Sequence, residues 1–170
     1  MQPQDIQNHI FQGAEKLGWK IATAESCTGG MIATRLTDPT GASASVAGGI
    51  VTYSPAMKTN LLGVTEACLK AHGAVSDETV TAMAKGCLAR TQAQLVLSVS
   101  GFAGPAGGAA EKPVGTVYFA VLSVADEAPE TTKVIFDGNR SDVREQATDF
   151  ALKLLADKIA AVLAESHGDK

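Results

Sequence analysis

The stretch "WKIATAESCTGG", residues 19–30, decides the fold, because it joins an apolar run of strand length to a glycine turn. The next residues, "MIATRLT", have the apolar spacing of a short helix. A strand that passes directly into a helix is the first part of a β–α unit. A turn alone needs fewer functional groups than "ESCT" supplies, so the stretch also predicts a site.

The rest of the chain repeats this alternation. Amphipathic spacing and N-capping residues predict helices, and short apolar runs predict strands. The expected helices span 5–17, 28–37, 77–88 and 141–162, with two short pieces between 55 and 72 that break near Gly63. The expected strands span 19–25, 45–53, 94–100, 116–124 and 132–138. In the second strand, Gly48 and Gly49 predict a bulge or a close backbone contact.

Strands interleaved with helices in this way predict an α/β fold. We expect a three-layer α/β/α sandwich around a mixed, largely parallel sheet. The length of 170 residues suits one domain, residues 1–170, with a core from about 5 to 163. Ligands of such sheets lie beyond the carboxyl ends of the strands, which directs attention to the turns after the first and third strands.

Composition and charge narrow the class of protein. The formal charge of −4, without a cluster of Lys and Arg, argues against a nucleic-acid surface. Three cysteines without a CxxC pair suggest neither a disulfide framework nor a zinc site. The first residues lack the layout of a signal peptide, and no apolar run reaches membrane-spanning length. We therefore expect a cytoplasmic protein that uses neither a membrane nor a nucleic acid.

The turn after the first strand offers both donors and nucleophiles. Backbone N–H groups of Thr28, Gly29 and Gly30 would lie unpaired at a helix N-terminus, where they favour an anion or a developing oxyanion. Ser26 and Cys27 are the two candidate nucleophiles. A purely structural interpretation also fits, in which Ser26 or Thr28 caps the helix and Cys27 packs in the core.

A nucleophilic serine needs a base, and lysine is the better candidate. The three histidines, His9, His72 and His167, are not at strand ends, which disfavours a Ser-His-Asp triad. In "YSPAMK", Tyr53 ends the second strand and Lys58 lies in the first turns of the helix that Pro55 begins. Both could face Ser26, although a core tyrosine and a solvated lysine are the alternatives. Burial or a nearby cation would have to lower the pKa of such a lysine.

Two further segments could bind a substrate. Arg140, just before the expected Ser141 cap of the last helix, could contact a phosphate or raise the potential near Lys58, whereas Arg144 better fits a surface role. In "SGFAGPAGG", Ser100, Gly101 and Gly104 could form a tight backbone surface against a ligand. A flexible loop is the alternative for that segment.

These pieces together resemble a known family. The blocks "TAESCTGG", "GGIVTYSPAMK", "LGV", "HGAVS", "SGFAGPAGG", "KPVG" and "FDGNRSDVR" occur in the order found in the CinA (competence/damage-inducible protein A) C-terminal domain family. Stand-alone members of that family are nicotinamide-nucleotide amidases, and others are fused behind an N-terminal nucleotide-processing domain. The likeness extends from about residue 5 to 163.

The resemblance implies a fold, a reaction and a set of residues. It implies an α/β/α domain that hydrolyses the carboxamide of nicotinamide mononucleotide to nicotinic acid mononucleotide and ammonia, in pyridine-nucleotide salvage. It further implies no metal and no cofactor, and a possible homodimer. The residues that match the family's motifs comprise a serine nucleophile, a lysine base, a tyrosine and several substrate-binding positions: Ser26, Lys58, Tyr53, Ser43, Ser100 and Arg140.

Three departures from the family pattern leave alternatives open. Pro55 replaces a usual Asn, Ala106 a common Asp, and Ser100 a frequent Thr. Pro55 and Ala106 leave the shape of the pocket and the preferred substrate open. The alternatives are an amidase of a different small carboxamide and a catalytically silent module that binds a nucleotide, in which Lys58 serves only as a phosphate contact.

Overall fold

The computed structural model describes residues 3–168, and the side chains of residues 5–166. It contains five strands, six α-helices and one 3-10 helix within that range. The strands are β1 (Ile21–Glu25), β2 (Val46–Val51), β3 (Leu95–Gly101), β4 (Thr116–Ser123) and β5 (Glu130–Ile135). The helices are α1 (Pro3–Leu17), α2 (Met31–Thr37), η1 (Ala42–Ala44), α3 (Pro55–Leu62), α4 (Glu66–His72), α5 (Asp77–Thr91) and α6 (Arg140–Gly168).

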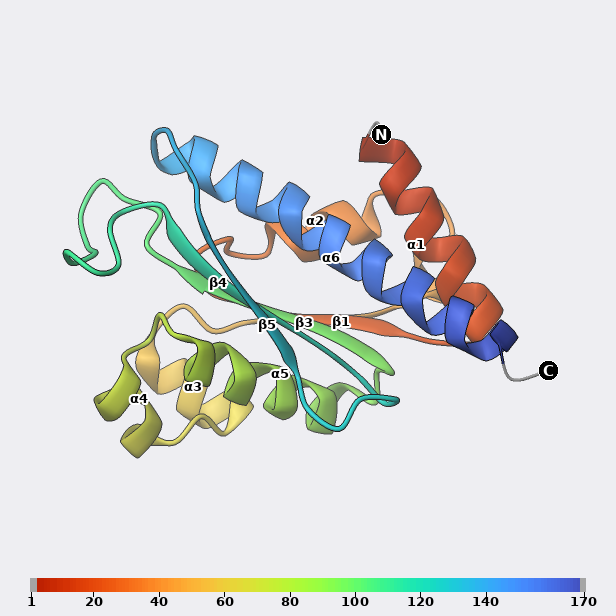
Figure 1. The fold of residues 1–170 in the computed structure, drawn as a ribbon, viewed down its shortest axis with the longest axis horizontal. Coiled ribbons are helices and arrows are strands. Elements are labelled where there is room, and N and C mark those ends of the chain that lie inside the picture. Colours follow the sequence, from red (N-terminus) through yellow and green to blue (C-terminus); the bar gives the residue numbers. More distant parts are fainter. Residues whose placement is uncertain (1–2, 169–170) are drawn as a thin grey trace.

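The elements form three layers around one sheet, as the sequence predicts. Figure 1 shows α1, α2 and α6 on one face of the sheet, and α3, α4 and α5 on the other. Because helices cover both faces, the side chains of β1 and β4 are buried along their whole length. The α/β/α prediction is confirmed.

The sheet is mixed, with the order β2-β1-β3-β4-β5. β1 pairs in parallel with both β2 and β3, whereas β4 pairs antiparallel with both β3 and β5. Four strands therefore run in one direction and β4 runs against them. The carboxyl ends of β1, β2 and β3 consequently meet at one edge of the sheet, where a ligand site is expected.

The larger part of the core lies between the sheet and the layer of α1, α2 and α6. It includes Phe119, whose ring packs against those of Phe136 and Phe150 at centroid distances of 6.3 and 5.2 Å. Contacts of this kind fix α6 against β4 and β5. The start of α6 is thereby held near the carboxyl ends of the parallel strands.

The glycines of β2 behave as the sequence predicts. The register between β1 and β2 shifts after Ile21, and Gly48 adopts a φ of +147°, which is the mark of a bulge. A side chain at Gly49 would lie 2.6 Å from the Thr23 hydroxyl oxygen and 2.9 Å from Ala33. Glycine therefore allows α2 to pack closely on this pair of strands.

The beginning of α6 differs from the prediction. Asn139, rather than Ser141, caps the helix: its Oδ1 accepts hydrogen bonds from the N–H groups of Ser141 and Asp142 at 2.8 and 3.2 Å. The Asp142 carboxylate in return accepts from the Asn139 N–H at 2.8 Å, which completes a capping box. Arg140 is consequently the first residue of the helix rather than a residue before its cap.

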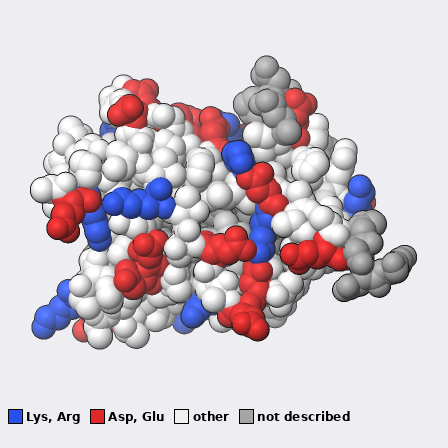
Figure 2. Space-filling model, viewed as in Figure 1, with Lys and Arg blue, Asp and Glu red and all other residues white. Residues whose placement is uncertain are grey.

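Charged side chains are mixed on the surface. On the face shown in Figure 2, Lys and Arg are interspersed with Asp and Glu and do not gather into a basic patch. Within residues 3–168, none of the helices has the length and apolarity that crossing a bilayer requires.

Gly86 determines how closely α5 approaches α3, and we predict that Gly86→Ala destabilises the fold. A Cβ at this position would lie 1.8 Å from the Leu62 carbonyl oxygen, so the two helices would have to separate. We expect the free energy of unfolding, measured with urea, to fall by about 2 kcal/mol. Lys85→Ala, at an exposed position of the same helix, is the control and should change little. An unchanged Gly86→Ala variant would show that the contact is not restrictive.

Candidate active site

A small pocket opens at the carboxyl ends of the parallel strands. Its volume is about 210 Å³, which is enough for one aromatic ring with a small substituent. The residues that line it come from the turns after β1 and β2, from α3, from the segment between α4 and α5, from the end of β3 and the turn after it, and from the start of α6: Ser26, Cys27, Tyr53, Lys58, Ala74, Val75, Ser100, Gly101, Phe102, Ala103 and Arg140.

Helix α3 carries Lys58 into this pocket. Ser54 caps the helix by accepting from the Met57 N–H, and Pro55 occupies its first turn. Lys58 then faces the sheet rather than solvent and is only 1% exposed. Full burial of a lysine is rare and requires specific partners.

The partners of Lys58 are the nucleophile candidate and the chain that ends β2. Its Nζ lies 2.8 Å from Ser26 Oγ and donates to the Thr52 carbonyl oxygen at 2.7 Å. The structure thus brings together the two residues that the sequence analysis paired as nucleophile and base. A neutral amine at this distance can accept the Ser26 hydroxyl proton while an N–H still bonds Thr52.

Burial prepares Lys58 to act as a base. Because desolvation disfavours the ammonium form, the pKa of Lys58 falls from 10.5 to about 8. A nearby cation was the other expected cause of a lowered lysine pKa. It is not needed here, since Arg140 bonds Gly104 and Tyr53 instead. At pH 7, Lys58 is then neutral in about one protein molecule in ten.

The second nucleophile candidate, Cys27, lies in an environment that disfavours its thiolate. Burial raises the pKa of Cys27 to about 11, although the adjacent N–H groups of Cys27 and Thr28 and the charge of Lys58 act in the opposite direction. The thiol therefore stays protonated near neutral pH. The geometry favours Ser26 over Cys27.

The carboxylate of Glu25 occupies part of the set of N–H groups that the sequence predicts as oxyanion donors. Glu25 is fully buried and accepts from the N–H of Gly30 at 3.0 Å, and from further donors of the turn and of α2. The Gly29 N–H bonds the Ser26 carbonyl oxygen at 3.0 Å. The prediction of unpaired N–H groups at Gly29 and Gly30 is therefore wrong, because Glu25 already fills the helix N-terminus.

Two other N–H groups of the turn, those of Cys27 and Thr28, have no oxygen acceptor within the described part of the chain. Both contact the Cys27 thiol, which is a weak acceptor that an oxyanion can replace. The Thr28 side chain, in contrast, donates to Glu25 at 2.7 Å and is buried. Thr28 was predicted as a donor, and its backbone N–H still fits that prediction.

Arg140 and Tyr53 form a pair at the mouth of the pocket. Arg140 donates to the Tyr53 hydroxyl at 2.7 Å and to the Gly104 carbonyl oxygen at 2.9 Å. Tyr53 is 60% exposed. Because the Tyr53 hydroxyl contacts Arg140 while Lys58 and Ser26 contact each other directly, a proton can pass between Lys58 and Ser26 without Tyr53.

The end of β3 supplies one wall. Ser100 is buried, and its hydroxyl donates to the Ala74 carbonyl oxygen at 2.7 Å. A side chain at Gly101 would meet Val117 at 2.7 Å, so glycine is needed to keep this wall close to β4. Gly104 lies farther out and lines a neighbouring cavity of about 420 Å³ that also contains Arg140.

Ser43 lies far from the pocket within one chain, contrary to the expectation from the family resemblance. It belongs to η1, which precedes β2, and its carbonyl oxygen accepts from Lys20 at 2.7 Å. Since β1 and β2 are parallel, this places Ser43 at the amino ends of the strands, opposite the end that carries Ser26.

The sequence analysis did not identify two residues that hold the turn that carries Ser26. Glu25 appeared only as the first letter of "ESCT", and the signal that could have identified it is a charged residue at the end of a mostly apolar strand. Arg144 was interpreted as a surface residue, yet it is half-buried and bonds the carbonyl oxygens of Cys27 and Thr28. Nothing local in the sequence predicts that contact.

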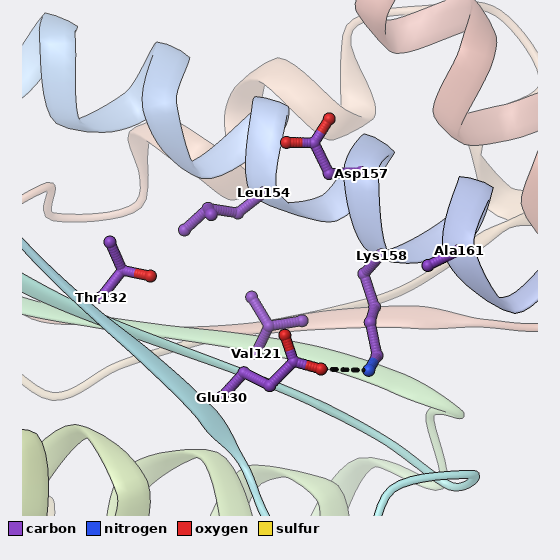
Figure 3. Close-up of a pocket in the computed structure, with 7 residues that line it drawn as sticks. All are labelled: Val121, Glu130, Thr132, Leu154, Asp157, Lys158 and Ala161. Atoms are coloured by element: carbon purple, nitrogen blue, oxygen red, sulfur yellow. Dashed lines mark hydrogen bonds and ion pairs between the residues drawn. The ribbon is translucent and has the colours of Figure 1, made fainter.

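A different cavity lies between α6 and the outer strands, at the opposite end of the sheet (Figure 3). Lys158 points across it toward Glu130, and Lys158 Nζ lies 2.6 Å from carboxylate oxygens of both Glu130 and Asp126. Lys158 is thus paired with two carboxylates, and no serine or cysteine is among the residues that line this cavity. The pocket that contains Ser26 is the better candidate for an active site.

The comparison with protein families agrees with the fold and the motifs. The model of the CinA C-terminal domain matches residues 3–159. The chain belongs to this family. The family membership that the sequence motifs indicated is thereby confirmed.

Curated relatives carry the same family name. The CinA-like protein of Mycolicibacterium vanbaalenii is 52% identical over 138 residues, which is 81% of this chain and 32% of the relative. The CinA-like protein of Mycobacterium leprae is 50% identical over 152 residues, 89% of this chain and 34% of the relative. The chain therefore spans about a third of the length of these CinA-like proteins.

Solved structures share the fold over nearly the whole chain. A competence-damaged protein (CinA) superfamily protein from Klebsiella pneumoniae has a TM-score of 0.88 and 35% identity, covering 95% of this chain and 99% of that one. The competence/damage inducible protein CihA from Agrobacterium tumefaciens has a TM-score of 0.79 and 39% identity, covering 89% and 93%. None of these names states a reaction.

We predict that Lys58→Met makes folding stability less dependent on pH. Below pH 8 the folded parent must hold a charged, buried amine, which costs about 3 kcal/mol for a pKa lowered from 10.5 to about 8. This cost disappears as pH rises from 8 to 10.5. The stability of the variant relative to the parent, from urea unfolding, should therefore fall by about 3 kcal/mol over that range. A difference that is independent of pH would contradict a lowered pKa.

Proposed function

We propose that this chain is a serine amidohydrolase that converts nicotinamide mononucleotide to nicotinic acid mononucleotide and ammonia. The observation that carries the proposal is the distance of 2.8 Å between Lys58 Nζ and Ser26 Oγ inside a buried pocket. A lysine acts as a general base when burial keeps a fraction of it neutral, and the lowered pKa of Lys58 meets this condition. The resemblance to the nicotinamide-nucleotide amidases supplies the substrate.

The first half of the reaction forms an acyl-enzyme. Neutral Lys58 takes the proton of the Ser26 hydroxyl, and Oγ attacks the carboxamide carbon. The carbonyl π electrons move to oxygen, and the N–H groups of Cys27 and Thr28 are the candidate donors to that oxyanion. When the intermediate collapses, the ammonium of Lys58 protonates the leaving nitrogen, and ammonia departs.

The second half regenerates the enzyme. Lys58 is neutral again once it has protonated the leaving group, so it can deprotonate a water molecule that attacks the acyl carbon. Collapse of this second intermediate breaks the bond to Ser26 Oγ, which takes back the proton from Lys58. The product is formed as the carboxylic acid, which loses its proton to solvent and leaves as the carboxylate of nicotinic acid mononucleotide.

The neighbouring cavity suits the rest of the nucleotide. It adjoins the pocket at Ala103 and Arg140. It is lined further by Gly138 and Asn139 just before α6 and by Ser141 and Arg144 in the first turns of that helix. The pyridine ring would lie in the smaller pocket, with the ribose and 5′-phosphate outside it. Arg140 is exposed and is the candidate phosphate ligand, since a guanidinium binds phosphate oxygens well.

A catalytically silent nucleotide binder is less compatible with the geometry. In that alternative, Lys58 would contact the phosphate of a bound nucleotide. Lys58 is instead 1% exposed and directed at Ser26 and Thr52. A residue that binds a solvent-facing phosphate does not need such burial.

Loss of the nucleophile tests the proposal directly. With nicotinamide mononucleotide as substrate, Ser26→Ala should reduce ammonia release by at least about 1,000-fold, because the acyl-enzyme cannot form. Ser166→Ala, an exposed serine near the end of α6, is the control and should turn over at the parental rate. Mass spectrometry of acid-quenched parent enzyme should locate the acyl group on Ser26. Parental turnover in Ser26→Ala, or an adduct on Cys27, would refute the mechanism.

The pH dependence of turnover tests the role of Lys58. Only the neutral amine accepts a proton, so kcat/KM should rise with pH to a plateau, with a midpoint near the Lys58 pKa of about 8. Below the midpoint the rate should fall about tenfold per pH unit. Tyr53→Phe should keep the same midpoint, since the Tyr53 hydroxyl contacts Arg140. A profile that is flat from pH 6 to 9 would exclude Lys58 as the base.

A further inference from the structure

Arg144 connects α6 to the turn that carries Ser26. Its Nε donates to the Cys27 carbonyl oxygen at 3.0 Å, and its Nη2 donates to the Thr28 carbonyl oxygen at 3.2 Å. The guanidinium thus bonds two successive backbone carbonyl groups immediately after the nucleophile. Arg144 is one helical turn beyond Arg140, so both arginines project from the same face of α6.

The bond to Cys27 determines the direction of the next N–H group. The peptide between Cys27 and Thr28 is trans, so its carbonyl oxygen and its N–H point to opposite sides of the chain. When Arg144 holds the Cys27 carbonyl oxygen, the Thr28 N–H must point away from Arg144. This N–H is one of the two in the turn that have no oxygen acceptor within the described residues.

The other available N–H group is oriented locally. The Ser26 carbonyl oxygen accepts from the Gly29 N–H at 3.0 Å, which closes a turn. This bond fixes the peptide between Ser26 and Cys27, and with it the Cys27 N–H. The turn itself therefore orients one N–H, whereas the Thr28 N–H depends on a side chain 116 residues away.

We infer that Arg144 is a positioning residue that orients the Thr28 N–H as an oxyanion donor. This inference rests on the proposed amidase function and adds a residue to it. Arg144 does not line the pocket that contains Ser26, so it acts on the reacting carbonyl through the backbone. It also lines the neighbouring cavity, where a contact with the substrate would change KM and not the preference for an oxygen over a sulfur substrate. Glu25 holds the opposite side of the turn by accepting from the Gly30 N–H, so the turn is fixed at its N–H groups and at its carbonyl groups.

The helix that carries Arg144 is well placed for this purpose. The capping box of Asn139 and Asp142 fixes the first turn of α6, two residues before Arg144. The planar guanidinium can bond two carbonyl oxygens at once, which the single nitrogen of a lysine does less well. Arg144→Lys should therefore restore only part of the effect of Arg144.

The experiment compares three arginine variants in the hydrolysis of nicotinamide mononucleotide. Arg144→Met should lower kcat by about 10- to 100-fold, because the donor acts mainly in the transition state, and it is this loss of kcat that tests the inference. Arg144→Lys should give an intermediate kcat. Arg140→Met should mainly raise KM.

Arg35→Met is the matched control for structural damage. Arg35 also joins α2 to α6, through Glu145 at 2.7 Å and Asp149 at 3.3 Å, but it does not touch the turn. Its loss should leave kcat unchanged. Equal losses of kcat in Arg35→Met and Arg144→Met would show that general loosening of α6, rather than the Thr28 N–H, explains the effect.

A thioamide analogue of the substrate gives a readout that a merely structural role would not change. Sulfur accepts hydrogen bonds weakly, so the parent should prefer the oxygen substrate through its oxyanion donors. Arg144→Met should reduce that preference by about tenfold, since one donor is already misdirected. Arg35→Met should keep the parental preference. An undiminished preference in Arg144→Met would overturn the inference.

A binding measurement separates this inference from the proposed function. If the parent releases no ammonia, the amidase proposal fails, but the orientation of Thr28 can still be examined with nicotinic acid mononucleotide, whose carboxylate mimics the oxyanion. Adding it should shift the backbone amide NMR signals of Cys27 and Thr28 in the parent. In Arg144→Met, the shift of Thr28 should be lost and that of Cys27 retained. Absence of a Thr28 shift in the parent would also overturn the inference.

Discussion

The burial of one amine is the constraint on which the site depends. Lys58 is held inside the protein, 2.8 Å from Ser26 Oγ, with Thr52 as its other partner. In water this amine would be charged at neutral pH and could not act as a base. Desolvation inside the protein instead lowers its pKa to about 8. This burial lowers the free energy of unfolding below that pH, since a buried ammonium is unfavourable. Such a cost at a pocket is typical of function, because a core lysine contributes nothing to packing that methionine could not supply.

The three-layer architecture explains how this pair forms. β1 and β2 are parallel neighbours, but the chain leaves β1 toward α2 on one face and leaves β2 toward α3 on the other (Figure 1). Ser26 and Lys58 therefore approach from opposite layers and meet over the end of the sheet. Close packing keeps them there: Gly86 lets α5 press against the end of α3, and Glu25 ties β1 to α2.

The sequence predicts much of this arrangement, and what it misses has a common cause. Strand and helix periodicity indicated the layers, and the turn residues around Ser26 and Lys58 indicated the pocket, because local spacing determines both. The partners of single polar groups depend on distant segments. Glu25 fills a helix N-terminus that appeared unpaired, Arg144 reaches the turn from α6, and Asn139 caps where Ser141 was expected. The family resemblance predicted Ser43 in the pocket, but the parallel direction of β1 and β2 places it at the other end of the sheet.

The most direct measurement of the central claim is the titration of Lys58 itself. In protein labelled with ¹³C at lysine Cε, the Lys58 signal can be assigned by its loss in Lys58→Arg and followed between pH 6 and 11 by NMR. The account predicts a midpoint near 8 for this signal, well below the ordinary lysine pKa of about 10.4. A Lys58 signal with a midpoint at that ordinary value would contradict the account, because an amine that remains charged at neutral pH cannot accept the Ser26 proton.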